Sequence, residues 1–210
     1  RINDEDAKVA AAVRLTIPQA AAAAEHAAAG IAKGGRLIYV GAGTSGRLGV
    51  LDASECPPTF GVSYETVQGH IAGGYGALIH AAEGAEDDAD TGAELIDSLD
   101  VNADDTVIGI SASGGARYVI AAVKRAREKG AYTAAITSNP NTPLGRAAET
   151  EIAAITGAEA VAGSTRMKCG TAQKMVLNMI STSAMARLGR IRGGLMTDMV
   201  ATNEKLRERA

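Results

Sequence analysis

The sequence predicts an α/β protein whose parallel sheet is covered by helices. Three observations support this prediction: short apolar runs are typical of buried strands, turns rich in glycine or hydroxyl residues follow them, and helical stretches follow the turns. Strands that alternate with helices need crossover connections, which produce a parallel sheet with helices on both faces. The 210 residues suit one large domain or two small ones, and the 46% hydrophobic content is enough for a packed core.

Two helices are predicted before the first strand. An Asn-Asp pair at positions 3–4 can cap an alanine-rich helix over 7–15, since alanine has the highest helix propensity. A second helix over 18–33 has a proline in its first turn and is stopped by the glycine pair 34–35.

The rest of the chain alternates between the two kinds of element. The predicted strands, which are short aliphatic and β-branched runs, cover residues 36–40, 63–68, 106–110, 132–137 and 151–155. The predicted helices that follow them cover residues 47–53, 76–83, 87–98, 118–129, 170–188 and 195–209. Because no low-complexity linker divides the chain, we expect a helical lead over 1–34 and one α/β domain over 35–210 with helices at its C-terminal end.

The composition argues against several classes of function. One Phe, five Tyr and no Trp leave little surface for stacking bases, and a net charge of −3 is not the basic footprint of a duplex binder. Cys56 and Cys169 have no second cysteine or histidine at metal-ligand spacing, so we expect reduced thiols, with a catalytic nucleophile as the alternative. No apolar stretch is long enough to span a bilayer. The N-terminus is charged and shows no signal peptide, so we expect a cytoplasmic protein. The sequence does not begin with Met, so the natural start can lie upstream.

Two turns at predicted strand ends favour anion binding. Residues 41–46 and 111–115 combine glycines with small hydroxyls, and each leads into a helix whose free N–H groups attract negative charge. The first turn also fits the G-x-G-x-x-G dinucleotide fingerprint, with Glu65 at the distance of the ribose-binding acid, but that explanation leaves the second turn unused. A phosphate or phosphosugar site accounts for both turns; a dinucleotide site and plain tight turns are the alternatives.

The remaining polar residues leave their roles open. The histidines at positions 26, 70 and 80 are scattered and form no metal pattern. Glu86 and its acidic neighbours suit a helix N-terminus, where the dipole stabilises them, and Glu55 suits a surface position before a proline turn.

Longer motifs add a family resemblance. Residues 41–49 read GAGTSGRLG and continue into DASECPPTFG at 52–61, a run that resembles the N-acetylmuramic acid 6-phosphate etherases of the sugar isomerase (SIS) domain superfamily. The other segments similar to that family are IAGG at 71–74, EGAEDD at 83–88, GSTRMK at 163–168, GTAQK at 170–174, LNMIST at 177–182 and ATNEKL at 201–206. The resemblance covers nearly the whole chain and is far more specific than a lone glycine fingerprint.

This resemblance implies an SIS-type three-layer α/β/α sandwich with a five-stranded parallel sheet, and a homodimer with its site near the interface. The family acts as a lyase that cleaves the D-lactyl ether of N-acetylmuramic acid 6-phosphate, in cytoplasmic amino-sugar catabolism and peptidoglycan recycling, and no metal or organic cofactor is expected. Animal glucokinase regulatory protein shares this ancestry, so a non-catalytic phosphosugar-binding regulator is an alternative, as is a phosphosugar isomerase.

The resemblance also implies roles for individual residues. Glu55 is the expected acid that protonates the departing lactate, and Glu86 is the candidate base. A Ser-Thr turn before the helix predicted from Gly170 is expected to offer a further anion site. The expected phosphate and sugar contacts are Gly43, Thr44, Ser45, Ser111, Ser113, Ser164 and Thr165.

The sequence departs from the family pattern in two respects. Residues 113–118 read SGGARY where the family pattern predicts SGRTPY, and Gly115 is expected to loosen this loop because glycine loses more backbone entropy on ordering. The family also has a lead-in and a C-terminal helical region beyond the two ends of this chain.

Overall fold

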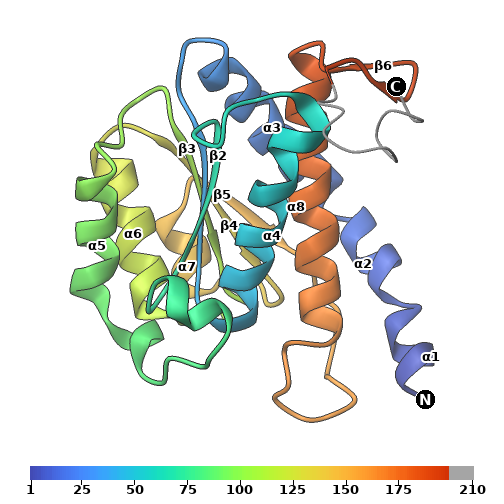
Figure 1. Ribbon diagram of the computed structural model, residues 1–210. Helices are drawn as coiled ribbons and strands as arrows, with labels where there is room; N and C mark the ends of the chain where they lie inside the picture. Colours follow the sequence, from blue (N-terminus) through green and yellow to red (C-terminus); the bar gives the residue numbers. More distant parts are fainter. Residues whose placement is uncertain (199–210) are drawn as a thin grey trace.

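A parallel five-stranded sheet forms the centre of the protein in a computed structural model, which describes residues 1–198 (Figure 1). Its strands run in the order β2-β1-β3-β4-β5. In chain order they are β1 (Leu37–Gly41), β2 (Val67–Ile71), β3 (Thr106–Ile110), β4 (Tyr132–Thr137) and β5 (Thr150–Ala153). Every residue of β1 and β3 is buried, as expected for strands covered on both faces.

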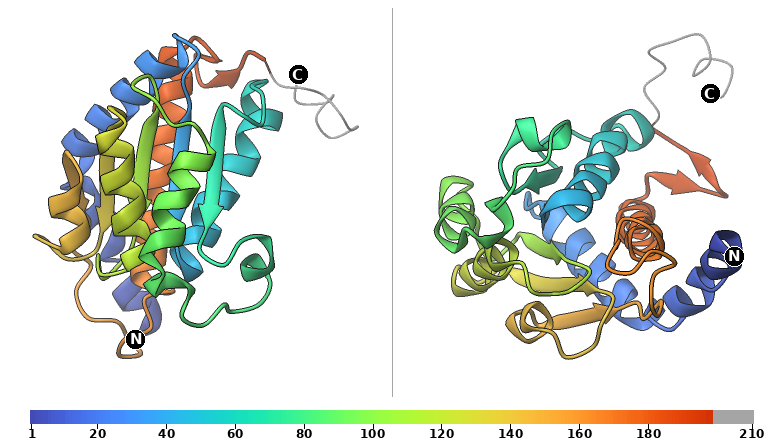
Figure 2. Two further views of the ribbon diagram at one scale, coloured as in Figure 1. Left: turned by 90° about the vertical axis from the view of Figure 1, so that its left-hand side faces the viewer. Right: turned by 90° about the horizontal axis from the view of Figure 1, so that it is seen from below.

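Helices cover both faces of the sheet, so the protein is the three-layer α/β/α sandwich that was expected (Figure 2). Alternate residues of β1 face opposite cores: Leu37 and Tyr39 pack with α3, α4 and α8, whereas Ile38 and Val40 pack with α5, α6 and α7. The helices that form the first layer are α3 (Ile17–Ile31), α4 (Gly43–Phe60) and α8 (Lys168–Arg187). Those of the second layer are α5 (Ala89–Ser98), α6 (Arg117–Glu128) and α7 (Pro143–Ala147).

The strand order creates a switch point between β1 and β3. From β1 the chain crosses through α4 to β2 on one side, and it then returns past β1 to β3 on the other. Loops that leave neighbouring strands in opposite directions open a crevice at the carboxyl edge of the sheet, where α/β proteins bind ligands. The two glycine- and hydroxyl-rich turns lie at this edge, because one follows β1 and the other follows β3.

The first helices differ from prediction. The helix expected over 7–15 is the shorter α2 (Val9–Arg14), and a separate helix that was not predicted, α1 (Ile2–Asp6), precedes it. The Asn-Asp pair expected to cap the predicted helix lies inside α1. α3, β1 and α6 lie within two residues of their predicted bounds, and β3 and β4 match theirs.

Larger differences occur near the glycine loop. α4 begins four residues earlier than predicted and continues to Phe60, with Pro57 and Pro58 in its last turn, before Gly61 ends it in the left-handed region at φ 63°. The helix expected over 76–83 is reduced to the 3₁₀ turn η1 (Tyr75–Leu78), and a second turn, η2 (Ala85–Asp87), precedes α5. β2 begins four residues later than predicted, and α7 was not predicted.

The helix predicted over 195–209 is wrong at its start. Residues Ile191–Arg192 (β6) and Leu195–Met196 (β7) pair as an antiparallel hairpin. Gly193 and Gly194 connect them at φ 59° and 82°, and two successive positive φ angles are typical of the type I′ hairpin turn. The rest of the predicted helix, with the ATNEKL motif, lies outside the described residues. None of the described helices combines the length and hydropathy needed to cross a bilayer.

Candidate functional site

The N-terminus of α4 faces the switch point without a side-chain cap from the described residues. Ala42 is its N-cap residue, and Gly43, Thr44 and Ser45 form its first turn. The first N–H groups of a helix have no intrahelical acceptor, and the helix dipole adds partial positive charge there. The predicted contact residues Gly43, Thr44 and Ser45 therefore lie at an uncapped helix N-terminus.

The glycines of this loop have two different roles. A Cβ at Gly41 would lie 2.6 Å from the Gly46 nitrogen, and a Cβ at Gly46 would lie 2.6 Å from the Ile71 side chain, so both glycines allow β1, α4 and β2 to pack closely. Gly43 instead has φ +53° and open space around its Cβ position. A ligand can consequently approach the backbone at Gly43.

The second loop is ordered by its own hydrogen bonds. The Gly114 N–H donates to Ser111 Oγ at 3.2 Å, and the Gly115 N–H donates to Ser113 Oγ at the same distance. Gly114 has φ +67° and packs so tightly on Thr142 that an added Cβ would overlap it. α6 follows without a side-chain cap from the described residues, so a second uncapped helix N-terminus lies at the same edge of the sheet as the first.

A pocket of about 300 Å³ adjoins the α4 N-terminus and contains Gly43, Arg47 and Glu86 in its lining. Arg47 donates to the carbonyl oxygens of Ala77 and Leu78 at 2.7 and 2.9 Å, which fastens η1 to α4. The structure thus brings the predicted base into one pocket with the glycine loop, together with a cation that the sequence reasoning had not assigned.

The altered second loop is tied to the turn that carries Glu86. Arg117, the arginine displaced in this chain, lies 3.6 Å from the Asp87 carboxylate across the gap between α6 and η2. Asp88 then caps α5 by accepting from the Thr91 N–H at 3.1 Å, and hydrogen bonds from the Thr91 side chain and backbone lower the pKa of Asp88. The acidic run therefore contains one helix cap, one ion-pair partner and the candidate base.

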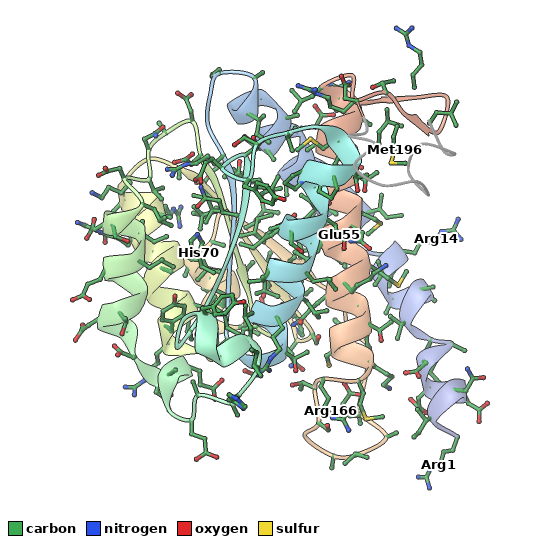
Figure 3. The ribbon with its side chains drawn as sticks, viewed as in Figure 1. Arg1, Arg14, Glu55, His70, Arg166 and Met196 are labelled. Carbon is green, nitrogen blue, oxygen red and sulfur yellow. The ribbon has the colours of Figure 1, made fainter. Side chains whose placement is uncertain are left out.

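Glu55 lies away from this pocket within a single chain. It is exposed on α4, twelve residues after Gly43, which is about 18 Å along a helix axis. Figure 3 shows Glu55 partway along the helical layer, whereas Arg166, in the loop that leads into α8, lies near the carboxyl edge of the sheet. The two predicted catalytic carboxyl groups are therefore not brought together in one chain.

The N-terminus of α8 is occupied by a carboxylate of the protein itself. Glu159 accepts hydrogen bonds from the N–H groups of Lys168 and Cys169 at 3.1 and 3.0 Å. Burial acts to raise the pKa of Glu159, but the hydrogen bonds from Cys169 and Lys168 outweigh it and lower the pKa. An anion site at this helix start, as the sequence suggested, would have to displace Glu159.

Ser164 and Thr165 nevertheless lie near the first loop. Gly170 is the point of contact: a Cβ there would lie 3.5 Å from Thr44 Cγ2 and 3.7 Å from the Thr165 carbonyl oxygen. Ser164 is half-buried and Thr165 is exposed. The Ser-Thr turn is therefore a neighbour of the α4 N-terminus, by way of the first turn of α8.

Two buried polar groups next to the site were missed from the sequence. Gln173 on α8 accepts a hydrogen bond from Ser45 Oγ at 3.0 Å, and Asp52 on α4 accepts from Tyr39, Asn178 and Ser181. Both belong to motifs that were quoted for the family resemblance, GTAQK and DASECPPTFG. Apolar and polar positions alternate too irregularly in these motifs to show which polar groups turn inward.

Other candidate residues have structural surroundings. His26 stacks on Tyr132 with ring centroids 3.8 Å apart, and burial lowers the pKa of His70. Cys56 and Cys169 are buried free thiols, and burial raises the pKa of both, to about 12 for Cys56. A cavity of about 630 Å³ lies between β2 and α5, and none of the predicted site residues lines it. Within residues 1–198 no cluster of three metal-ligating side chains occurs.

The fold and the switch-point site define a class. The sequence pattern of the SIS domain matches residues 88–183, and that of the glucokinase regulatory protein N-terminal SIS domain matches residues 19–127. A protein of Escherichia coli CFT073, solved as a complex, has a similar fold, with a TM-score of 0.64, 18% identity and coverage of 92% of this chain and 90% of that one. A phosphoheptose isomerase of Neisseria gonorrhoeae gives a TM-score of 0.63 at 17% identity, covering 88% and 94%. The chain is an SIS-domain protein.

Sequence similarity narrows this class to one family. The N-acetylmuramic acid 6-phosphate etherase of Cronobacter sakazakii is 57% identical over 210 residues, which are 100% of this chain and 71% of that protein. The etherase of Yersinia pestis (strain Pestoides F) is 57% identical over 209 residues, with the same shares. The chain belongs to the N-acetylmuramic acid 6-phosphate etherase family.

Proposed function

We propose that the protein cleaves the D-lactyl ether of N-acetylmuramic acid 6-phosphate to give N-acetylglucosamine 6-phosphate and D-lactate. The 57% identity to named etherases over the full chain is the observation that carries this proposal. The open helix N-termini at the switch point are consistent with a sugar phosphate, since they attract an anion without a metal.

The chemistry needs one base and one acid. In the open-chain sugar the C2 proton is acidic because it lies α to the aldehyde, and a base removes it. The C3–O bond then breaks, the acid protonates the departing lactate oxygen, and water adds to C3 of the unsaturated aldehyde. The sum is substrate plus water giving the two products, and two carboxyl groups in different environments suffice.

We assign the base to Glu86 and the acid to Glu55. Support for Glu86 is its place in one pocket with Gly43 and Arg47, next to the first loop. The phosphate is placed at Gly43, Thr44 and Ser45. The remaining contacts to phosphate and sugar are assigned to Ser111, Ser113, Ser164 and Thr165.

In this proposal a homodimer brings Glu55 close to the site that contains Glu86. Glu55 is exposed and lies about 18 Å along α4 from the loop, so in this proposal the acid of one subunit serves a site that includes groups of its partner. We place the enzyme in the cytoplasm, in keeping with its two free thiols.

The direct test is D-lactate release from N-acetylmuramic acid 6-phosphate. Glu55→Gln and Glu86→Gln should each abolish release, whereas Glu149→Gln, an exposed acid after α7, should leave it unchanged. Solvent deuterium should enter C2 with the wild type and with Glu55→Gln, but not with Glu86→Gln. Lactate release undiminished in Glu55→Gln, or full exchange in Glu86→Gln, would remove that residue from its assigned role.

A phosphosugar-binding regulator is the second candidate. The match to the glucokinase regulatory protein domain and the altered SGGARY loop favour it. In that case the wild type binds the sugar phosphate but releases no lactate. A phosphosugar isomerase would exchange the C2 proton and interconvert sugars, again without lactate.

A further inference from the structure

One buried side-chain amide beside the first glycine loop makes a hydrogen bond through its oxygen but none through its nitrogen. Gln173 is 1% exposed, and its Oε1 accepts from Ser45 Oγ at 3.0 Å. Its Nε2 has no partner among the described residues. Whichever way the amide is turned, only one of its two ends faces Ser45. A buried polar group without a partner is rare in native proteins and calls for an explanation.

The position of the amide connects it to the site. Ser45 is in the first turn of α4, where the helix N–H groups are uncapped, and Gln173 is in the first turns of α8. Gly170, one turn before Gln173, lies beside Thr44, since a Cβ added there would be 3.5 Å from Thr44 Cγ2. The side chain with the unpartnered amide nitrogen is thus hydrogen-bonded to one of the hydroxyls that we assign to the phosphate.

The hydroxyl of Ser45 carries one hydrogen, so it cannot donate to Gln173 and to an anion at the same time. When Ser45 turns its hydrogen to an anion, its oxygen is left to accept a hydrogen bond. A glutamine amide can supply this donor by rotating half a turn about its last torsion, which is soft and roughly two-fold. Nε2 then faces Ser45, and the donor that had no partner is used.

We propose that Gln173 is a positioning residue whose amide reverses when phosphate binds, so that the Ser45 hydroxyl is directed at the anion. The inference rests on the proposed phosphosugar site at the α4 N-terminus. Gln173 acts only through Ser45 and does not touch the C2 and C3 atoms at which bonds change. Its removal therefore weakens binding and leaves the chemical step in place.

Two substitutions of similar size test whether Ser45 needs a donor, an acceptor or both from residue 173. Gln173→Met removes both the donor and the acceptor, and Gln173→Glu keeps an acceptor for Ser45 but adds a negative charge behind the anion. Each should raise the Kd for inorganic phosphate and the KM for substrate about 10-fold, with Gln173→Glu the worse of the two and kcat within about 2-fold. The matched control is Ser138→Ala, because Ser138 Oγ is also buried and has no hydrogen-bond partner among residues 1–198, Ser45 included.

A double-mutant cycle with Ser45→Ala gives the decisive readout. Phosphate Kd is measured by calorimetry, KM and kcat by D-lactate release, and folding by thermal unfolding. We expect Gln173→Met to have no further effect on either constant in the Ser45→Ala background, and Ser138→Ala to change neither constant. Additive effects of the two substitutions, an unchanged phosphate Kd in Gln173→Met, or no phosphate binding by the wild type would each overturn the proposal. If the wild type binds phosphate but releases no lactate, the proposed function fails, and the phosphate cycle still decides the role of Gln173.

Discussion

The hydroxyl of Tyr39 donates a 2.9 Å hydrogen bond to the carboxylate of Asp52, and both side chains are buried. Asn178 and Ser181 of α8 donate to the other carboxylate oxygen, so one acid of α4 joins the inner strand β1 to α8. Burial, together with the Asp52 charge, raises the pKa of Tyr39 well above its usual value and keeps its hydroxyl a donor.

Tyr39→Phe should destabilise the protein by about 1–3 kcal/mol, because a buried carboxylate loses one of its donors without regaining water. The measurement is the free energy of unfolding in urea. Tyr132→Phe is the control: Tyr132 donates to the neutral hydroxyl of Thr150 at 2.6 Å in a less buried place, so its loss should cost less. Equal losses in the two variants would contradict a special role for the charged acceptor.

Replacing the two glycines of the second loop by alanine should change the stability of the protein in opposite directions. Gly114→Ala forces a side chain into φ +67° and onto Thr142, so we expect a loss of about 2–4 kcal/mol. Gly115 has no positive φ, and its Cβ position meets Ser113 Oγ at 3.6 Å, an ordinary contact. Gly115→Ala should therefore raise stability by about 0.4–1 kcal/mol through the unfolded state. Urea unfolding of both variants checks this, and a destabilised Gly115→Ala would show that the loop needs glycine there.

The ion pair between Glu5 and Lys168 should make stability depend on acid pH. Lys168 is buried and lies 2.6 Å from Glu5, and hydrogen bonds from Lys168 and Lys8 lower the pKa of Glu5 from 4.5 to about 2. Because the pKa is lower in the folded state, the stabilisation is complete above pH 4.5 and is lost as the pH falls towards 2. The gap in urea midpoint between wild type and Glu5→Gln should therefore close over this range. Glu25→Gln, which breaks the exposed pair with Arg187, should show a much smaller gap above pH 4.5.

The two thiols should be inert in the folded protein. Both cysteines are buried, and burial raises the pKa of Cys56 to about 12 and also raises that of Cys169. Thiolate is the reactive form, so a disulfide reagent at pH 8 should label neither residue in the native state and both in guanidinium chloride. Rapid native labelling of one equivalent would restore a reactive cysteine as a candidate.

Local patterns predicted the centre of the fold well. β3 and β4 lie where their aliphatic runs predicted them, because strands buried on both faces are continuously apolar. Prediction failed where tertiary contacts override local signals. Arg47 holds η1 as a short turn, for example, and a diglycine turn makes a hairpin of the region expected to begin a helix.

The candidate site likewise has parts that local sequence patterns predicted and parts that they did not. Glycine spacing and hydroxyl content located both loops in the sequence. This worked because the tight turns of these loops require glycine at particular positions, so the residue types themselves indicate the turns. Gln173 and Ser45 are 128 residues apart in sequence, so no local pattern could predict their hydrogen bond. Glu159 lies only about ten residues before the start of α8, but the loop between them has no regular pattern that predicts their contact.

By itself the sequence determined the α/β class, the positions of the two glycine- and hydroxyl-rich loops and the family resemblance, since these depend on local periodicity and on ungapped motifs. Only the tertiary structure decided that Glu86 shares a pocket with Gly43 and Arg47 while Glu55 lies apart on α4. The physical reason is that a pocket depends on the strand order and on the packing angles of helices. These are global properties, which place side chains from distant segments together or keep neighbours on one helix apart.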